Sequence, residues 1–166
     1  MSELSQIVDE QDNLIGLKLR NEIDYSKDYY RVSALWLTNS IGQVLIAQRV
    51  LAKDKDPGMW GPAAAGTVEK DETYENNIYK EAEEEIGLSG VSFSTGPKIR
   101  METPRKYFLQ WFVGTVNMAA SDFTPQPSEV EQVIWVYPQA LAIDVAEQPG
   151  KYVPSMSLAI QAFCKK

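Results

Sequence analysis

Hydrophobic residues recur every four positions between Tyr74 and Ile86. Tyr74, Ile78, Ala82 and Ile86 fall on one face of a helix, and no Gly or Pro interrupts the run. At about 100° per residue they cover an arc of about 120°, the width of the buried stripe of an amphipathic helix. The pattern therefore predicts a helix that begins at Tyr74.

The same helix carries an acidic cluster whose angular position is unusual. Glu81 lies at about 340° and Glu84 at about 280° from the first residue of the stripe, whereas Glu85 lies at about 20°, inside the apolar arc. A run of charges is ordinarily a solvated helix face, which accounts for Glu83 but not for Glu85. Carboxylates this close repel one another, and one on the core side loses hydration. A divalent cation such as Mg²⁺ supplies the missing charge.

Apolar runs before this helix predict a hairpin followed by the first strands of a sheet. Residues 5–20 are expected to form two short strands around a turn at 10–13, and residues 21–30 a loop. The main sheet is expected to begin at Arg31, with strands over 32–37, 44–50 and 63–68, a turn at 39–42 and a loop over 51–62. Residues 1–30 are interpreted as an N-terminal β-hairpin extension packed on a main domain of residues 31–166, within a single folding unit.

The pattern after the helix predicts more strands and two late helices. The expected strands are 91–102, 107–117 and 131–137, with a turn at 103–105 and a loop over 118–128. Pro138 is suited to the start of a helix over 139–147, and a last helix over 154–165 is expected to be capped by Ser155. This order suggests an α/β (α+β) fold, a mixed sheet with helices on both faces.

Composition narrows the class of protein. The chain has 166 residues, 44% hydrophobic and 23% charged, which suits one globular domain. Its net charge of −7 and the lack of a basic stripe argue against a nucleic-acid polymer as partner. A small phosphate ester that arrives with its own metal ion meets no such objection.

The rarer residue types limit the chemistry and the compartment. The chain contains no His, so acid–base chemistry falls to carboxylates, Lys, Tyr or water. Its single cysteine, Cys164, cannot form an intramolecular disulfide, which favours a reducing, cytoplasmic compartment. No signal peptide or long apolar run indicates a membrane partner. Whether the chain forms a homodimer is left open.

Residues 66–88 resemble the Nudix box, G-x5-E-x7-R-E-U-x-E-E-x-G-U with U apolar. The matching positions are Gly66, Glu72, Glu81, Ala82, Glu84, Glu85, Gly87 and Leu88. Lys80 stands where the pattern has Arg. The resemblance implies the Nudix fold, a three-layer α/β/α sandwich with a mixed sheet. It also implies a pyrophosphohydrolase that splits nucleoside diphosphates linked to another group with Mg²⁺ or Mn²⁺.

The resemblance implies roles for the box residues and their surroundings. The metal ions are expected to be held by Glu81, Glu84, Glu85 and the backbone carbonyl of Ala65. The carboxylate that deprotonates the attacking water is then Glu81 or one from a later loop. Two residues are candidates for that later carboxylate, Glu129 and Glu131, and either would equally suit a solvated strand entrance.

The replacement of the box Arg by Lys80 affects the activity that is expected of the chain. In the family the box Arg pairs with the acid at Glu72, which fixes the loop to the helix. Lys80 keeps the charge but offers no bidentate fork, so the pair should be less rigid. This leaves open a competing class, a catalytically weak or inactive Nudix domain that binds a nucleotide or a protein partner.

Sequence outside the box is similar to the isopentenyl-diphosphate-isomerase-like branch of the family. The similarity covers residues 6–137 and includes 8–10, 13–16, Gln48-Arg49 and the run Pro57-Gly58-Met59-Trp60. Isomerases of that type use a Cys before the box glycine and His residues for a structural metal. Ala65 and Tyr30 occupy those positions here, so isomerisation is expected to be absent and hydrolysis of a diphosphate remains.

Candidate substrate contacts are less specific. Basic residues near predicted loops and strands could meet phosphates, although each is also explained as a surface charge: Arg49, Lys53, Lys55, Arg100, Arg105 and Lys106. Trp60, Tyr107 and Trp111 could stack on a base, although aromatic residues in strands are more often core. The sequence does not choose among nucleotides, nucleotide sugars and isoprenoid diphosphates.

Overall fold

The structure, a computed structural model, describes residues 3–164 and is organised around strand β3 (Tyr29–Thr38). β3 pairs in parallel with β8 (Tyr107–Thr115) along its whole length. Its other edge pairs antiparallel with β1 (Leu4–Val8), β6 (Ala64–Thr67) and β4 (Val44–Arg49) in turn. A ten-residue strand rich in β-branched and aromatic residues is long enough to serve all four partners.

The remaining strands extend this mixed sheet, and all of them pair antiparallel. They are β2 (Leu14–Leu19) on β1, β5 (Trp60–Pro62) and β9 (Val130–Val136) on β4, and β7 (Ser94–Met101) on β8. Short 3₁₀ turns lie at Arg20–Glu22, Ala120–Asp122 and Pro149–Lys151. Among residues 3–164, no helix has the length and hydropathy needed to span a membrane.

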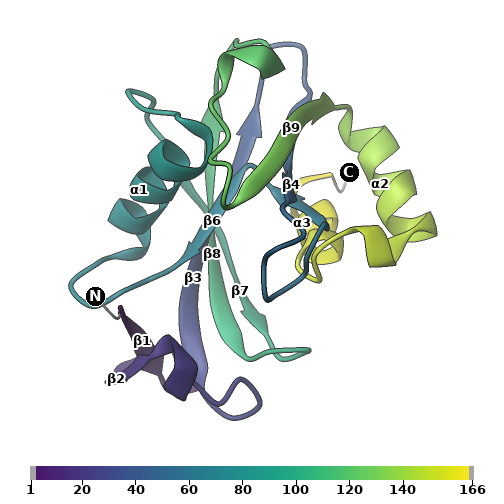
Figure 1. Cartoon of the computed structure of the whole chain (residues 1–166). Coiled ribbons are helices and arrows are strands. Elements are labelled where there is room, and N and C mark those ends of the chain that lie inside the picture. The colour runs from purple at the N-terminus through teal and green to yellow at the C-terminus, as the bar shows by residue number, and fades with distance from the viewer. Residues whose placement is uncertain (1–2, 165–166) are drawn as a thin grey trace.

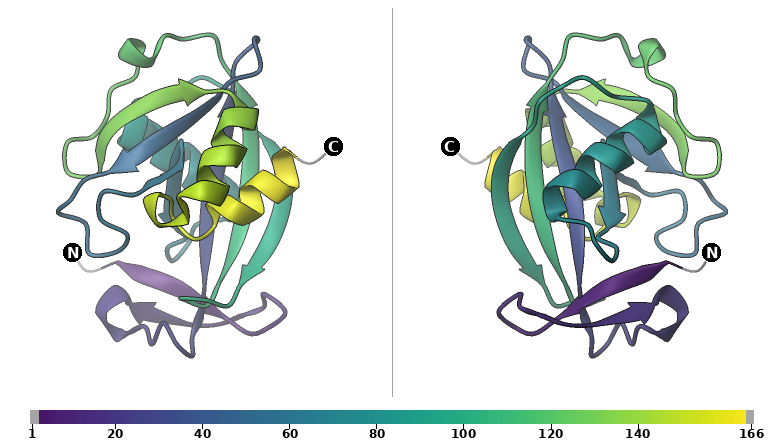
Figure 2. Two further views of the ribbon diagram at one scale, coloured as in Figure 1. Left: turned by 90° about the vertical axis from the view of Figure 1, so that its right-hand side faces the viewer. Right: turned by 90° about the vertical axis from the view of Figure 1, so that its left-hand side faces the viewer.

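Side chains that alternate along β3 divide the core between the two faces of the sheet. Trp36 packs in the cluster that includes α2 (Pro138–Glu147) and α3 (Met156–Phe163), whereas Leu35 packs in the cluster of α1 (Tyr74–Ile86). Figures 1 and 2 show α1 on one side of the sheet and α2 and α3 on the other. The expected three-layer α/β/α sandwich is confirmed.

The packing of α1 follows from the four-residue repeat. Ile78, Ala82 and Ile86 are fully buried. Burial of each Ile contributes about 1.5–3 kcal/mol. This face fixes the rotation of the helix against the sheet, and the rotation decides where its glutamates point.

Several expected elements differ from those observed. The expected loop over 51–62 ends in strand β5. This strand forms because its backbone pairs with β4, a contact that the local sequence pattern does not indicate. β3 begins at Tyr29 rather than at Val32, and β7 begins at Ser94 rather than at residue 91. Ser155 precedes α3 but makes no capping hydrogen bond with its side chain, so that expectation is wrong. The expected end of this last helix, Lys165, lies outside the described residues.

Candidate active site

The two ends of α1 are closed by hydrogen bonds that its sequence encodes. Thr73 and Asn76 form a reciprocal cap, each side chain accepting from the other's backbone N–H, at 3.0 and 2.8 Å. At the other end Gly87 adopts a left-handed conformation with φ of 68°. The N–H of Leu88 then donates to the Ala82 carbonyl at 3.1 Å. The helix is therefore held at both ends of the acidic stretch.

Two of its glutamates reach strand β6. The Glu85 carboxylate accepts a hydrogen bond of 2.9 Å from the Ala65 N–H. The Glu81 carboxyl group lies directly over Gly66, where a Cβ would stand 2.3 Å from Glu81 Cδ. Glu84 is exposed and lines a pocket together with Glu81 and Glu85. Within residues 3–164, no three acidic side chains already converge on one point as a metal site.

The electrostatics of Glu81 and Glu85 favour the arrival of positive charge. Burial raises the pKa of Glu85 to about 7, against the lowering effect of the Ala65 N–H. Burial, followed by the charge of Glu85, raises the pKa of Glu81 to about 8. Each carboxylate is thus costly to ionise unless a cation neutralises the pair. Carboxylate oxygens are the ligands that Mg²⁺ and Mn²⁺ prefer, so these residues fit such an ion.

The pocket that these acids line has a volume of about 840 Å³ and extends from α1 to residues of the core cluster that packs against α2 and α3. Its floor consists of side chains from β3 and β8, namely Tyr30, Val32, Ala34, Tyr107 and Leu109. Arg49, Arg105 and Glu129, which the sequence nominated, line it as well. Glu129 forms an ion pair with Lys53. The structure therefore brings these residues together with the box acids in one space.

Other nominated residues lie elsewhere. Trp60 packs against the core, and its carbonyl accepts a hydrogen bond of 2.9 Å from Val153. Trp111 is fully buried. Arg100 donates to the Tyr29 hydroxyl at 2.8 Å, outside the pocket, and Glu131 is exposed on β9. The expected substrate contacts of Trp60, Arg100 and Glu131 have no support from these positions.

Comparison with known proteins assigns the family. The sequence model of the NUDIX domain matches residues 29–156. The chain belongs to the Nudix hydrolase family. A prenyl-diphosphate phosphatase of Methanosarcina mazei is 32% identical over 151 residues, covering 90% of this chain and 88% of that protein. An uncharacterized Nudix hydrolase of Yersinia pestis is 28% identical over 156 residues, covering 94% of this chain and 85% of that protein.

The fold is similar to a solved structure over nearly the whole chain. The crystal structure of DR0079 from Deinococcus radiodurans superposes with a TM-score of 0.85 and 22% identity, covering 97% of this chain and 99% of that one. Members of the Nudix hydrolase family generally hydrolyse pyrophosphate bonds. The β1–β2 hairpin lies wholly outside the residues matched by the domain model, whereas the superposition covers 97% of the chain and so includes most of the hairpin.

Lys80, the departure from the Nudix box, is directed to the loop before α1. Its Nζ lies 2.9 Å from Glu72 Oε2, 3.5 Å from Glu69 and 3.9 Å from Glu81. Although burial lowers the pKa of Lys80, these carboxylates, Glu72 first, raise it overall. The Lys80 side chain is 33% exposed. A long side chain can follow the surface to an acid that its Cα direction does not indicate.

We expect the Glu72–Lys80 pair to orient the loop for catalysis in this Nudix chain. Lys80→Arg, which restores the bidentate fork, should raise the rate or leave it unchanged, whereas Lys80→Ala should lower it about tenfold, or ~1.4 kcal/mol. Lys70→Ala is the control, because Lys70 is an exposed neighbour on the same loop. Rates are compared at saturating metal. Equal rates for all variants would show that Lys80 is only a surface charge.

Asn77 is a buried polar residue that the sequence reasoning missed. Its Nδ2 donates to the Thr67 carbonyl at 3.1 Å and to Glu72 at 3.3 Å, and its Oδ1 accepts from the Ser33 hydroxyl. It thereby ties α1 to β3 and β6. Its position one turn from Tyr74 was the available signal, since it places an amide beside the apolar stripe.

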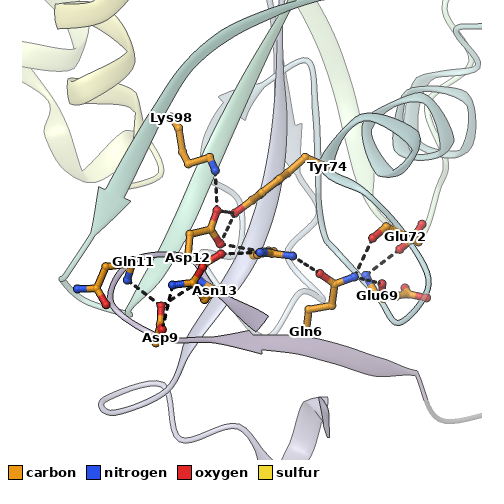
Figure 3. Close-up of polar contacts among 10 residues, drawn as sticks. Gln6, Asp9, Gln11, Asp12, Asn13, Glu69, Glu72, Tyr74 and Lys98 are labelled. Atoms are coloured by element: carbon orange, nitrogen blue, oxygen red, sulfur yellow. Dashed lines mark hydrogen bonds and ion pairs between the residues drawn. The ribbon is translucent and has the colours of Figure 1, made fainter. Parts of the chain in front are cut away.

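The N-terminal hairpin holds the box loop from the other side. Gln6 Nε2 donates to the carbonyls of Glu69 and Glu72 at 2.9 and 2.7 Å, and Gln6 Oε1 accepts from Arg31 at 2.7 Å. Arg31 Nε donates to Asp12 at 2.7 Å. Figure 3 shows this chain of contacts running from the hairpin turn to the loop. The loop that carries Glu72 is therefore fixed by residues outside the Nudix box.

The hairpin turn is itself fixed by a shared carboxylate. Asp12 has a positive φ of 64° and accepts from Lys98 at 2.6 Å and from the Tyr74 hydroxyl at 2.9 Å. Figure 3 shows these side chains meeting at Asp12. Because Tyr74 is the first residue of α1 and Lys98 lies on β7, one side chain joins three elements. Nothing in the local sequence pattern indicated this contact.

Proposed function

We propose that this Nudix hydrolase splits the diphosphate bond of a small molecule with Mg²⁺ or Mn²⁺. The observation that carries the proposal is the position of Glu81 and Glu85, two carboxylates with raised pKa values at one end of a substrate-sized pocket. When bound, the cation would neutralise phosphate charge and make the attacking water more acidic. A raised pKa at a pocket wall is typical of a functional site.

The residues of the chain would divide the remaining work. Glu81, Glu84, Glu85 and the Ala65 carbonyl would hold the cation, with Gly66 leaving room for the Glu81 carboxyl group. A water molecule at the diphosphate would lose its proton to Glu81 or to Glu129. Glu129 suits that role better than the exposed Glu131 does, because it lines the pocket.

The small size of the substrate follows from charge and space. A net charge of −7 opposes a polyanion, whereas a single diphosphate neutralised by its own cation can enter. The relative named prenyl-diphosphate phosphatase supports including isoprenoid diphosphates among the compounds to be tested. The pocket itself is lined by polar as well as apolar groups.

A substrate panel tests the proposal. The protein is incubated with nucleoside diphosphates, nucleotide sugars and isoprenoid diphosphates, each with Mg²⁺, with Mn²⁺ or with EDTA. We expect release of phosphate or of a nucleotide from at least one class, and only with metal present. Turnover in EDTA contradicts the metal requirement. Binding of compounds without turnover of any of them would instead favour a non-catalytic Nudix domain.

A further inference from the structure

Positive charge gathers at one end of the pocket, where Tyr30 and Tyr107 form its floor. Lys55 Nζ lies 3.5 Å from the centre of the Tyr25 ring and 5.5 Å from that of Tyr30. Arg105 belongs to the turn before β8 and lines the same pocket. These cations come from separate segments that only the fold brings together.

This charge is incompletely neutralised by the protein. Arg105 Nη2 donates to Asp56 at 2.8 Å, but Arg105 Nε is buried and has no hydrogen-bond partner among the described residues. In the part of the chain that the structure describes, Lys55 forms no ion pair within 4 Å, whereas Arg105 does. Burial, followed by the charge of Arg105, lowers the pKa of Lys55 to about 8. Lys55, whose ammonium packs on tyrosine rings, and Arg105, whose guanidinium keeps an unsatisfied donor, therefore line pocket space that an anion could occupy.

The register of the sheet separates this end from the box acids. Ala65, which donates to Glu85, lies opposite Ala34 on β3, whereas Tyr30 lies opposite Tyr107. The four residue steps from Ala34 to Tyr30 span about 13 Å at ~3.3 Å per residue. One diphosphate held at the acids is shorter than this distance.

The floor between the two ends carries no charge. Val32 and Leu109 line it midway along β3 and β8. An uncharged body can therefore lie between a diphosphate at Glu81 and Glu85 and a second polar group at the far end. The floor is therefore apolar between the acids of α1 at one end and Lys55 and Arg105 at the other.

We propose that Lys55 and Arg105 bind a second anionic group of the substrate, a phosphate or carboxylate remote from the diphosphate that is cleaved. This inference rests on the proposed function and specifies its substrate class. The substrate is then a diphosphate whose body crosses the apolar floor and ends in an anion. An isoprenoid diphosphate, whose remainder is hydrocarbon, offers no second anionic group to Lys55 or Arg105.

Synthetic alkyl diphosphates of graded length test this inference kinetically. Each length is prepared with a terminal phosphate, a terminal carboxylate or a terminal methyl group. For one range of lengths, KM should be about tenfold lower with an anionic end than with the methyl end, as expected for a charge-assisted hydrogen bond. The preferred end group distinguishes phosphate from carboxylate. Equal KM values for charged and uncharged ends at every length would overturn the inference.

Variants assign the effect to the named residues. Lys55→Gln and Arg105→Gln should raise KM for the anion-ended compound about tenfold more than KM for the methyl-ended compound. Lys27→Gln, at a side chain that is 81% exposed, should behave as the wild type. Arg105→Gln leaves Asp56 without its ion-pair partner and could prevent folding. In that case Lys55→Gln alone tests the assignment. A loss that is equal for charged and methyl-ended compounds would contradict the assignment.

A binding measurement separates this inference from the proposed function. Inorganic phosphate is titrated into the protein in EDTA by calorimetry, so no turnover is needed. Lys55→Gln should weaken phosphate binding about tenfold, and Lys27→Gln should not change it. Phosphate binding that depends on Lys55 in a protein without hydrolase activity would uphold the anion site and refute only the hydrolysis. Phosphate binding that is indifferent to Lys55 would refute the site.

Discussion

Glu85→Gln is expected to reduce turnover about 100-fold or more while leaving the fold intact. The amide oxygen of Gln can still accept the Ala65 N–H bond, so the contact between α1 and β6 is kept. What is lost is the negative charge that would hold the cation. Glu83→Gln is the matched control, because Glu83 is exposed on the same helix. Full activity of Glu85→Gln would show that this carboxylate does not bind the cation.

The same substitution should change how stability depends on pH in the metal-free protein. The pKa of Glu85 rises from 4.5 to about 7 on folding, so the folded protein retains a proton that the unfolded chain has lost. The stability present below pH 4.5 is therefore lost as the pH rises through about 7. Glu85→Gln lacks this loss, so in EDTA its Tm at pH 8 should equal or exceed that of the wild type.

A metal titration provides the second readout. Mg²⁺ should raise the Tm of the wild type, because it binds the folded state only, and should raise that of Glu85→Gln much less. Thermal scans at pH 5 and pH 8, with EDTA or with Mg²⁺, separate the two effects. An equal rise in both proteins would place the cation elsewhere.

Local pattern was sufficient for α1 and its acids. The four-residue repeat from Tyr74 to Ile86 gave the bounds of the helix, and the angle of Glu85 indicated a carboxylate on the buried side. Both signals depend only on helix geometry, which a short stretch of sequence determines. The layer arrangement required the family resemblance in addition, because strand order depends on pairing between distant segments.

Contacts between distant segments could not be predicted from the sequence. Gln6 reaches Glu69, a residue 63 positions away, and its role depends on a hairpin lying against the box loop. Lys55 and Arg105 each resemble a surface charge in sequence, and only the fold brings them to one pocket. Trp60 differs from these two residues. It was expected to stack on a base, but its side chain packs against the core. Side-chain length and strand register, rather than residue type, determine whether each of these side chains lies in the pocket, in the core or against the box loop.

Gly66→Ala is expected to lower activity about 100-fold with little change in stability, because its Cβ would occupy the place of the Glu81 carboxyl group. That Cβ would lie 2.3 Å from Glu81 Cδ and 2.4 Å from Glu81 Oε1, so the carboxylate must turn away. These atoms are the end of a flexible side chain, so the strand need not move. Gly16→Ala is the control, because a Cβ there meets nothing within 4 Å.

A double-mutant cycle shows whether Gly66→Ala acts through Glu81. In a Glu81→Ala background the carboxyl group is absent, so Gly66→Ala should cause no further loss of activity. Rates of the four proteins and their Tm values in EDTA are the measurements. If Gly66→Ala lowers the rate equally in both backgrounds, or unfolds the protein, the glycine serves the strand rather than the carboxylate. The expected result, a loss confined to the protein that retains Glu81, would make the missing side chain at residue 66 part of the catalytic geometry.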